Sequence, residues 1–154
     1  MTAVVAVVHD YPVSTDRLWD VVTDYDALAK IMRGWARFRG LPEGRVQAGQ
    51  GVDAAVSLFG LLPARPWRME IQHLDPEARR LRSREAGLGA RAWIHEIAVD
   101  PCPAGARLTD RVTVDAGWRT PVYAVFARAM LRGRHGPRCK ALGLMDRPNK
   151  TADA

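Results

Sequence analysis

Alternating apolar and polar residues run through most of the chain and predict an antiparallel sheet. The pattern starts at 2–11 and returns in later segments that turns rich in glycine and proline separate. The later segments are 35–41, 51–60, 67–74, 79–86, 91–100 and 105–115. Alternation of this kind is typical of strands with one face in the core and one in solvent.

Helical spacing replaces the alternation in two places. Between the first two strands, Ser14 is a favourable N-cap for a short helix whose apolar residues begin at Leu18. Asp24 can cap a second short helix, which Gly34 ends. We therefore expect two short helices after the first strand.

A long helix is predicted near the C-terminus, with Thr120 as its cap and Pro121 in its first turn. Gly133, Gly136 and Pro137 predict a kink or break in it. An apolar stripe at i, i+3, i+4, i+7 and i+8 is expected to face the core. The stripe comprises Val122, Val125, Phe126, Ala129 and Met130.

The element order indicates an α+β fold of the helix-grip type, a curved seven-stranded antiparallel sheet wrapped around the long C-terminal helix. We expect a single domain over 1–146 and a polar tail over 147–154. Because one helix cannot fill the concave face of a strongly bent sheet, the arrangement predicts a cavity.

The net charge of +6 raises the question of a nucleic-acid partner, and all but three of the 23 cationic residues are arginine. These residues are scattered, apart from one cluster near the C-terminus. The cluster comprises Arg128, Arg132, Arg134, His135, Arg138 and Lys140. We interpret it as a solvated helix face, with contact to a membrane surface or an acidic partner as an alternative. No specific nucleic-acid binding is expected, and at most peripheral membrane contact; the oligomeric state stays open.

No apolar run approaches the about 20 residues that span a bilayer. The two cysteines, Cys102 and Cys139, and the lack of an export leader favour a cytoplasmic location. There is no phosphate-binding glycine loop or hydrolase elbow. The histidines are spaced unlike metal ligands, so we expect no metal and no cofactor.

Two late strands place a polar pair on an apolar face. If the turn is Pro101–Ala104, then His95 faces Asp110, Ile97 faces Leu108 and Trp93 faces Val112. Directly opposed side chains are about 4.5–5.5 Å apart at Cβ, within reach of an imidazole–carboxylate contact. The pair is either a structural hydrogen bond or the polar end of a ligand cavity, and the sequence leaves both interpretations open.

Three segments resemble the superfamily of START lipid-transfer domains, birch-pollen-allergen-like proteins and bacterial polyketide cyclase/dehydrase relatives (SRPBCC). Residues 13–25, VSTDRLWDVVTDY, resemble its opening helix pair. WIHEI at 93–97 with GARLTDRV at 105–112 is similar to its paired late strands. RGRHGPR at 132–138 resembles an Arg/His-rich stretch in the last helix of some bacterial members.

The resemblance implies a cavity between the long helix and the sheet that holds a hydrophobic or amphipathic small molecule, such as a lipid, a quinone or a polyketide-like compound. Carriers and sensors of this fold need no catalytic group. The alternative is a cyclase or dehydratase in which Asp110 orients His95 for proton transfer. The predicted ligand-binding residues are Trp67, Met69, Ile71, Trp93, His95, Ile97, Asp110, Val112, Phe126 and Met130.

Overall fold

A computed structural model describes residues 1–144 of the chain. The strands are β1 (Ala3–Tyr11), β2 (Ala36–Arg39), β3 (Gly51–Leu58), β4 (Arg65–Asp75), β5 (Arg80–Gly87), β6 (Ala90–Cys102) and β7 (Gly105–Asp115). The helices are α1 (Thr15–Val22), α2 (Tyr25–Ile31), α3 (Thr120–Gly133) and α4 (His135–Ala141), with a 3-10 turn, η1 (Gly117–Arg119), before α3. The predicted tail and the domain boundary at 146 lie outside the described residues.

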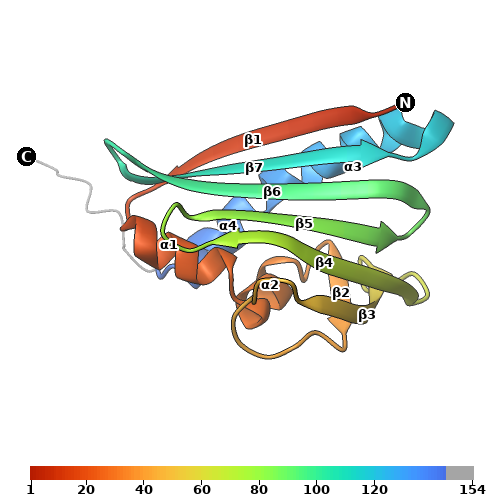
Figure 1. Cartoon of the computed structure of the whole chain (residues 1–154), viewed down its shortest axis with the longest axis horizontal. Helices are drawn as coiled ribbons and strands as arrows, with labels where there is room; N and C mark the ends of the chain where they lie inside the picture. The colour runs from red at the N-terminus through yellow and green to blue at the C-terminus, as the bar shows by residue number, and fades with distance from the viewer. Residues whose placement is uncertain (145–154) are drawn as a thin grey trace, which may run out of the picture.

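All seven strands form one antiparallel sheet in the order β1-β7-β6-β5-β4-β3-β2 (Figure 1). From β2 to β7 each strand pairs with the next one along the chain. The N-terminal strand β1 instead pairs with the last strand, β7. Both ends of the strand sequence therefore meet at the edge of the sheet along which α3 runs.

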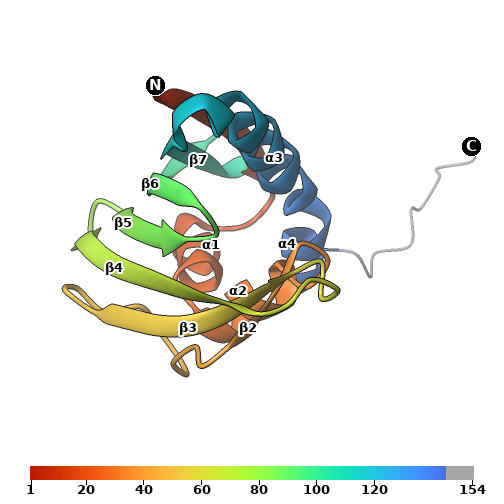
Figure 2. The ribbon, with the colours of Figure 1, turned by 90° about the vertical axis from the view of Figure 1, so that its right-hand side faces the viewer.

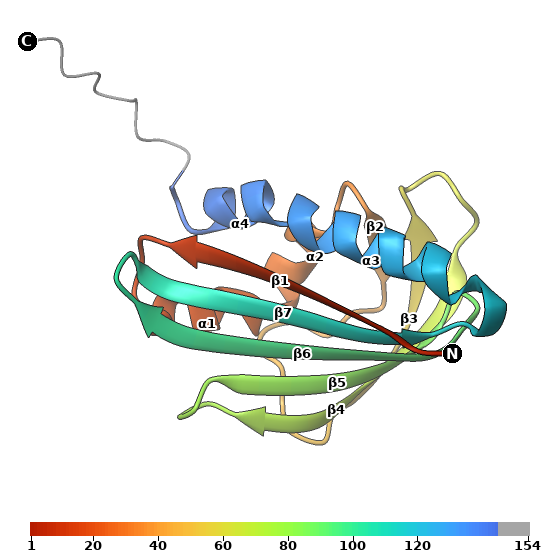
Figure 3. The ribbon, with the colours of Figure 1, turned by 90° about the horizontal axis from the view of Figure 1, so that it is seen from above.

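The sheet is strongly curved, and the helices lie on its concave side (Figure 2). Helix α3 packs mainly against β1 and β7, and α4 continues from it toward α2 (Figure 3). The middle strands, β4 to β6, curve away from α3 (Figure 2). The predicted helix-grip fold, with two short helices after the first strand, is confirmed.

Side chains near the helix ends act largely as predicted. Ser14 and Asp24 accept hydrogen bonds from the backbone N–H groups of Arg17 and Ala27, at 3.2 and 2.8 Å. The predicted break in the last helix is also present, between α3 and α4. Thr120 is the first residue of α3 rather than a side-chain cap.

The inward face of α3 differs from the predicted stripe. Val122 and Val125 are 69% and 71% exposed, and Ala129 is exposed as well. The buried residues of α3 that pack on the sheet are Ala127, Met130 and Leu131. The helix is therefore rotated relative to the prediction, which included Met130 correctly but chose Ala129 in place of Ala127 and omitted Leu131. The inward stripe continues into the buried Arg134 and Arg138.

The register of β6 and β7 also corrects the prediction. His95 pairs with Val112 and Ile97 pairs with Asp110, because the turn contains only two residues, Pro103 and Ala104. The prediction ended the strand before Pro101, but β6 has no β5 partner beyond Ala98, so the missing N–H there breaks no bond on that side. A shift of two residues keeps every side chain on its predicted face.

Candidate functional site

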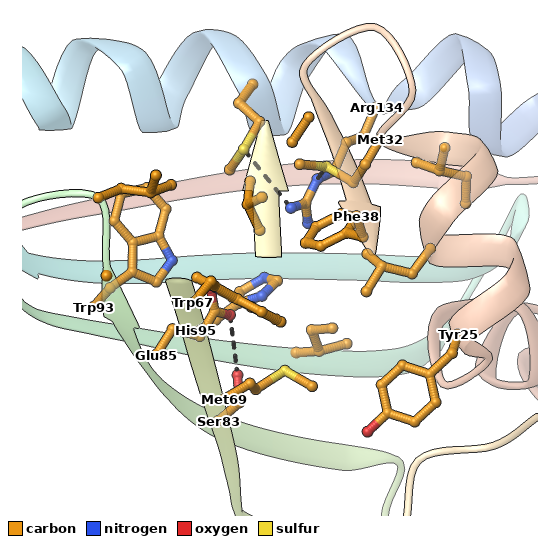
Figure 4. Close-up of a pocket in the computed structure, with 18 of the residues that line it drawn as sticks. Tyr25, Met32, Phe38, Trp67, Met69, Ser83, Glu85, Trp93, His95 and Arg134 are labelled. Atoms are coloured by element: carbon orange, nitrogen blue, oxygen red, sulfur yellow. Dashed lines mark hydrogen bonds between the residues drawn. The ribbon is translucent and has the colours of Figure 1, made fainter. Parts of the chain in front are cut away.

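A cavity of about 310 Å³ lies between the concave face of the sheet and helices α2 and α3 (Figure 4). This volume is at the lower end of the roughly 300–1,000 Å³ typical of small-molecule sites. Its walls are mostly apolar and include three large aromatic side chains, Phe38, Trp67 and Trp93. Its polar members include Tyr25, Ser83, Glu85, His95, Arg134 and Arg138.

Most of the sequence-predicted ligand-binding residues line this cavity. They are Trp67, Met69, Ile71, Trp93, His95, Ile97, Phe126 and Met130. The other two, Asp110 and Val112, are fully buried in β7 and do not form part of the cavity wall. Asp110 therefore acts on the cavity indirectly, through contacts with side chains that line it.

His95 and Asp110 are in contact despite the changed register. The Nε2 atom of His95 lies 2.9 Å from Oδ1 of Asp110, across a diagonal of the β6–β7 pair. His95 lines the cavity, and the carboxylate lies behind it. The predicted contact thus forms from neighbouring rather than directly opposed positions.

Asp110 has a second partner that the sequence did not indicate. Nη1 of Arg138 lies 2.8 Å from Oδ2 of Asp110, a close ion pair although the N–H bonds do not point directly at the oxygen. Asp110 is 0% exposed and Arg138 is 3% exposed. Burial alone would raise the pKa of Asp110, but the charge of Arg138 and the contact with His95 hold it well below its usual range.

The surroundings of Arg138 likewise favour its charged form. Burial opposes its charge, but Asp110 and the hydroxyl of Tyr11 raise the pKa of Arg138 overall. The pair is therefore ionised at neutral pH. A buried pair with this geometry fixes helix α4 against the sheet.

Arg134 is buried as well, at 7% exposure, and lines the cavity (Figure 4). Its Nε donates to the thioether sulfur of Met32 at 3.0 Å, and one Nη lies 3.8 Å from the sulfur of Met130. Within residues 1–144, no oxygen atom accepts a hydrogen bond from its guanidinium. Burial lowers the pKa of Arg134 to about 10, so the side chain still carries its charge at neutral pH.

Glu85 faces the same cavity from β5 (Figure 4). The hydroxyl of Ser83 donates to its Oε1 at a long 3.4 Å. Burial raises the pKa of Glu85 more than the neighbouring side chains of His95 and Arg134 lower it. No ion pair joins Glu85 to Arg134 in the described part of the chain.

Sequence reasoning missed the roles of three charged residues. The sequence analysis placed Arg134 and Arg138 on a solvated helix face and did not include Glu85 among the ligand-binding residues. One signal could have found the two arginines, because they continue the helical spacing of the buried Ala127 and Leu131, at i+7 and i+11 from Ala127. Alternation along β5 was a signal for Glu85, because it places Glu85 on the same face as the buried Leu81 and Ser83, just before the register with β6 shifts.

Comparison with known proteins places the chain in a family. The sequence profile described as "Domain of unknown function (DUF8410)" matches residues 10–141. The chain belongs to the DUF8410 family. A comparison with curated proteins gave no match.

Solved structures show the fold of this DUF8410 member independently. Ara h 8.0201 is 12% identical with a TM-score of 0.69, over 93% of this chain and 99% of that one. MLL2253 from Mesorhizobium loti is also 12% identical, with a TM-score of 0.72 over 94% and 100%. DynU16, from the dynemicin biosynthetic locus, is 19% identical with a TM-score of 0.64, over 91% of this chain and 47% of that one.

These likenesses confirm the predicted resemblance to the birch-pollen-allergen-like, SRPBCC superfamily at the level of the fold. In residues 1–144, no helix has both the length and the apolar character that crossing a membrane requires.

Proposed function

We propose that this DUF8410 member binds a hydrophobic or amphipathic small molecule in the cavity between the sheet and α3, as a carrier or sensor. The observation that carries the proposal is the cavity itself, an apolar space of about 310 Å³. An unoccupied space of this size in a core would cost packing energy, since protein interiors are otherwise close-packed. The fold shared with Ara h 8.0201 supports the same function.

The lining of the cavity suits a ligand that is largely apolar. Trp67 and Trp93 offer flat faces that suit a ring system or a folded chain. The methionines Met32, Met69 and Met130 contribute flexible walls that adapt to ligand shape. The polar groups in the lining are few, as is usual in small-molecule sites, where they fix the orientation of the ligand.

The test uses N-phenyl-1-naphthylamine, a neutral fluorescent probe of apolar sites. We expect saturable one-to-one binding to the wild type. Ser83→Phe places a ring in the cavity and is expected to weaken binding about tenfold or more, because Ser83 lies on the cavity wall. Arg84→Phe adds the same ring to the opposite, exposed face of β5 and is the matched control.

Native mass spectrometry of freshly purified protein complements the probe. We expect a bound mass that is lost on denaturation and that Ser83→Phe reduces. Absence of any bound species, together with no saturable uptake of the probe by the wild type, would contradict the proposal.

A second candidate function is that of a polyketide cyclase or dehydratase. It is favoured by one observation: His95 lines the cavity with Nε2 held by Asp110, while the described residues provide no hydrogen bond to its Nδ1. The ring can therefore exchange a proton with a bound carbonyl compound. On a model poly-β-ketothioester, His95→Ala is expected to slow aldol condensation or dehydration by about 100-fold or more. A folded His95→Ala protein with full turnover would remove His95 from the reaction.

A further inference from the structure

The cavity contains one buried guanidinium that lacks an oxygen partner among residues 1–144. Arg134 is 7% exposed, and in that part of the chain its hydrogen-bond acceptors are the sulfur atoms of Met32 and Met130. A thioether is a weak acceptor, whereas a guanidinium has five N–H donors arranged to hold a carboxylate by two parallel bonds. The guanidinium lines the cavity, so a ligand can reach it.

The carboxyl groups of Asp110 and Glu85 favour the charge of Arg134 through space, but among residues 1–144 neither forms an ion pair with it. Oδ1 of Asp110 contacts His95, and Oδ2 is paired with Arg138. Glu85 also faces the cavity, but no ion pair forms between it and Arg134 among the described residues. A buried carboxyl group can relieve its desolvation by taking up a proton, whereas a guanidinium cannot lose its charge in this way.

Arg134 therefore brings a buried guanidinium, with no oxygen partner among residues 1–144, to a space whose walls are mostly apolar. Arg134 lies at the junction of α3 and α4, while Phe38, Trp67 and Trp93 form apolar walls (Figure 4). An amphipathic anion has the matching distribution of an apolar body and one charged end. It would supply the oxygen acceptors that Arg134 lacks.

We propose that the cavity takes an amphipathic carboxylic acid whose carboxylate pairs with Arg134 and whose apolar part lies against the aromatic walls. This inference rests on the proposed small-molecule binding and adds the chemical class of the ligand. Arg134 is the specificity-determining residue, because it distinguishes an acid from a neutral compound of the same shape.

The experiment compares decanoic acid with decanamide by isothermal titration calorimetry at pH 7.5. The two compounds share the alkyl chain and differ in the charge of the head group. A charge-assisted hydrogen bond changes affinity by roughly 10- to 100-fold, so the wild type is expected to prefer the acid by at least about tenfold. Equal affinity for both compounds would overturn the inference and leave the proposed function standing.

The variants assign the preference to a residue. In Arg134→Met the acid is expected to lose its advantage and bind like the amide, while affinity for the amide stays within about threefold. Arg132→Gln removes the same charge from the exposed side of α3 and should keep the preference. Arg134→Gln provides a second substitution in case Arg134→Met does not fold, with near-ultraviolet circular dichroism as the check.

The outcomes separate the two proposals. A folded Arg134→Met or Arg134→Gln protein that still prefers the acid would place the head group elsewhere and overturn the inference. If the wild type binds neither decanoic acid, decanamide nor N-phenyl-1-naphthylamine, the proposed function fails and the inference fails with it. Binding of the neutral probe without preference for the acid refutes the inference alone.

Discussion

Arg134 and Arg138 lie one helical turn apart, and both are buried, yet their surroundings differ. Arg138 forms an ion pair with Asp110 at 2.8 Å, which is also held by His95. Among residues 1–144, the hydrogen-bond acceptors of Arg134 are sulfur atoms, and its side chain lines the cavity. The comparison indicates that the same residue type serves stability in one position and is available for a ligand in the other, according to whether the fold supplies its counter-charge.

The largest effect is expected at the paired arginine. Arg138→Met leaves the fully buried Asp110 without its cationic partner and should lower the free energy of unfolding by about 3–5 kcal/mol. Urea unfolding followed by tryptophan fluorescence measures this. A loss below about 1 kcal/mol would show that Asp110 does not depend on the pair.

The double variant Asp110→Leu/Arg138→Met is the control for that measurement. Removing both charges removes the unpaired ion, so the loss should be clearly smaller than the sum of the two single losses. Strict additivity would mean that the two side chains act independently.

The junction between α3 and α4 provides the second prediction. A Cβ on Gly133 would lie 2.7 Å from the indole of Trp35, so Gly133→Ala should cost about 1–3 kcal/mol of stability despite the better helix propensity of alanine. Gly136→Ala in α4 is the matched control, since nothing lies within 4 Å of the added methyl group. It should be neutral or stabilising by up to about 1 kcal/mol. Thermal unfolding of both variants measures these changes in stability. Equal changes for Gly133→Ala and Gly136→Ala would exclude a role for the Trp35 contact.

The unpaired arginine should behave in the opposite way to Arg138. Arg134→Met removes a buried charge that forms no ion pair within the described residues, and it should change the free energy of unfolding by less than about 1 kcal/mol, or raise it. Urea unfolding without ligand is the measurement. A loss as large as that of Arg138→Met would give Arg134 a structural role and abolish the contrast.

The smallest effects concern pH, where the two buried carboxyl groups should act in opposite senses. The folded-state pKa of Asp110 is depressed, so its contribution to stability is present above about pH 4 and is lost as the pH falls toward that lower pKa. The pKa of Glu85 is raised, so its protonated form favours folding below about pH 4.5 and this contribution is lost as the pH rises through the folded pKa.

Urea titrations between pH 3 and pH 8 test both signs. Glu85→Gln should raise stability relative to the wild type at the upper end of the range and less at the lower end. Asp110→Leu should reduce the loss of stability in acid. Parallel profiles for the wild type and Glu85→Gln would contradict the position of Glu85 in the cavity.

The sequence predicts the elements of this fold well because strands and helix caps are encoded locally. The alternation of apolar and polar residues located every strand to within a few residues. Ser14 and Asp24 indicated the starts of α1 and α2, because their side chains can cap a helix. The β6–β7 turn was predicted two residues too long, since proline at the end of a strand looks the same whether or not a neighbour needs its N–H.

The site was less predictable because its decisive contacts are distant in sequence. Arg138 becomes a buried ion only through Asp110, 28 residues earlier on another element. Cavity walls and solid core use the same residue types, so Val112 and Trp67 could not be separated from the sequence. Helix rotation depends on packing against the whole sheet, which is why Val122 and Val125 were placed inside.

A crystal structure of the protein soaked with decanoic acid tests the central claim most directly. The account predicts electron density for one molecule between α3 and the sheet, with its carboxylate within hydrogen-bond distance of the Arg134 guanidinium. An interior that is filled by its own side chains, with the acid absent or bound only on the outer surface, would contradict it.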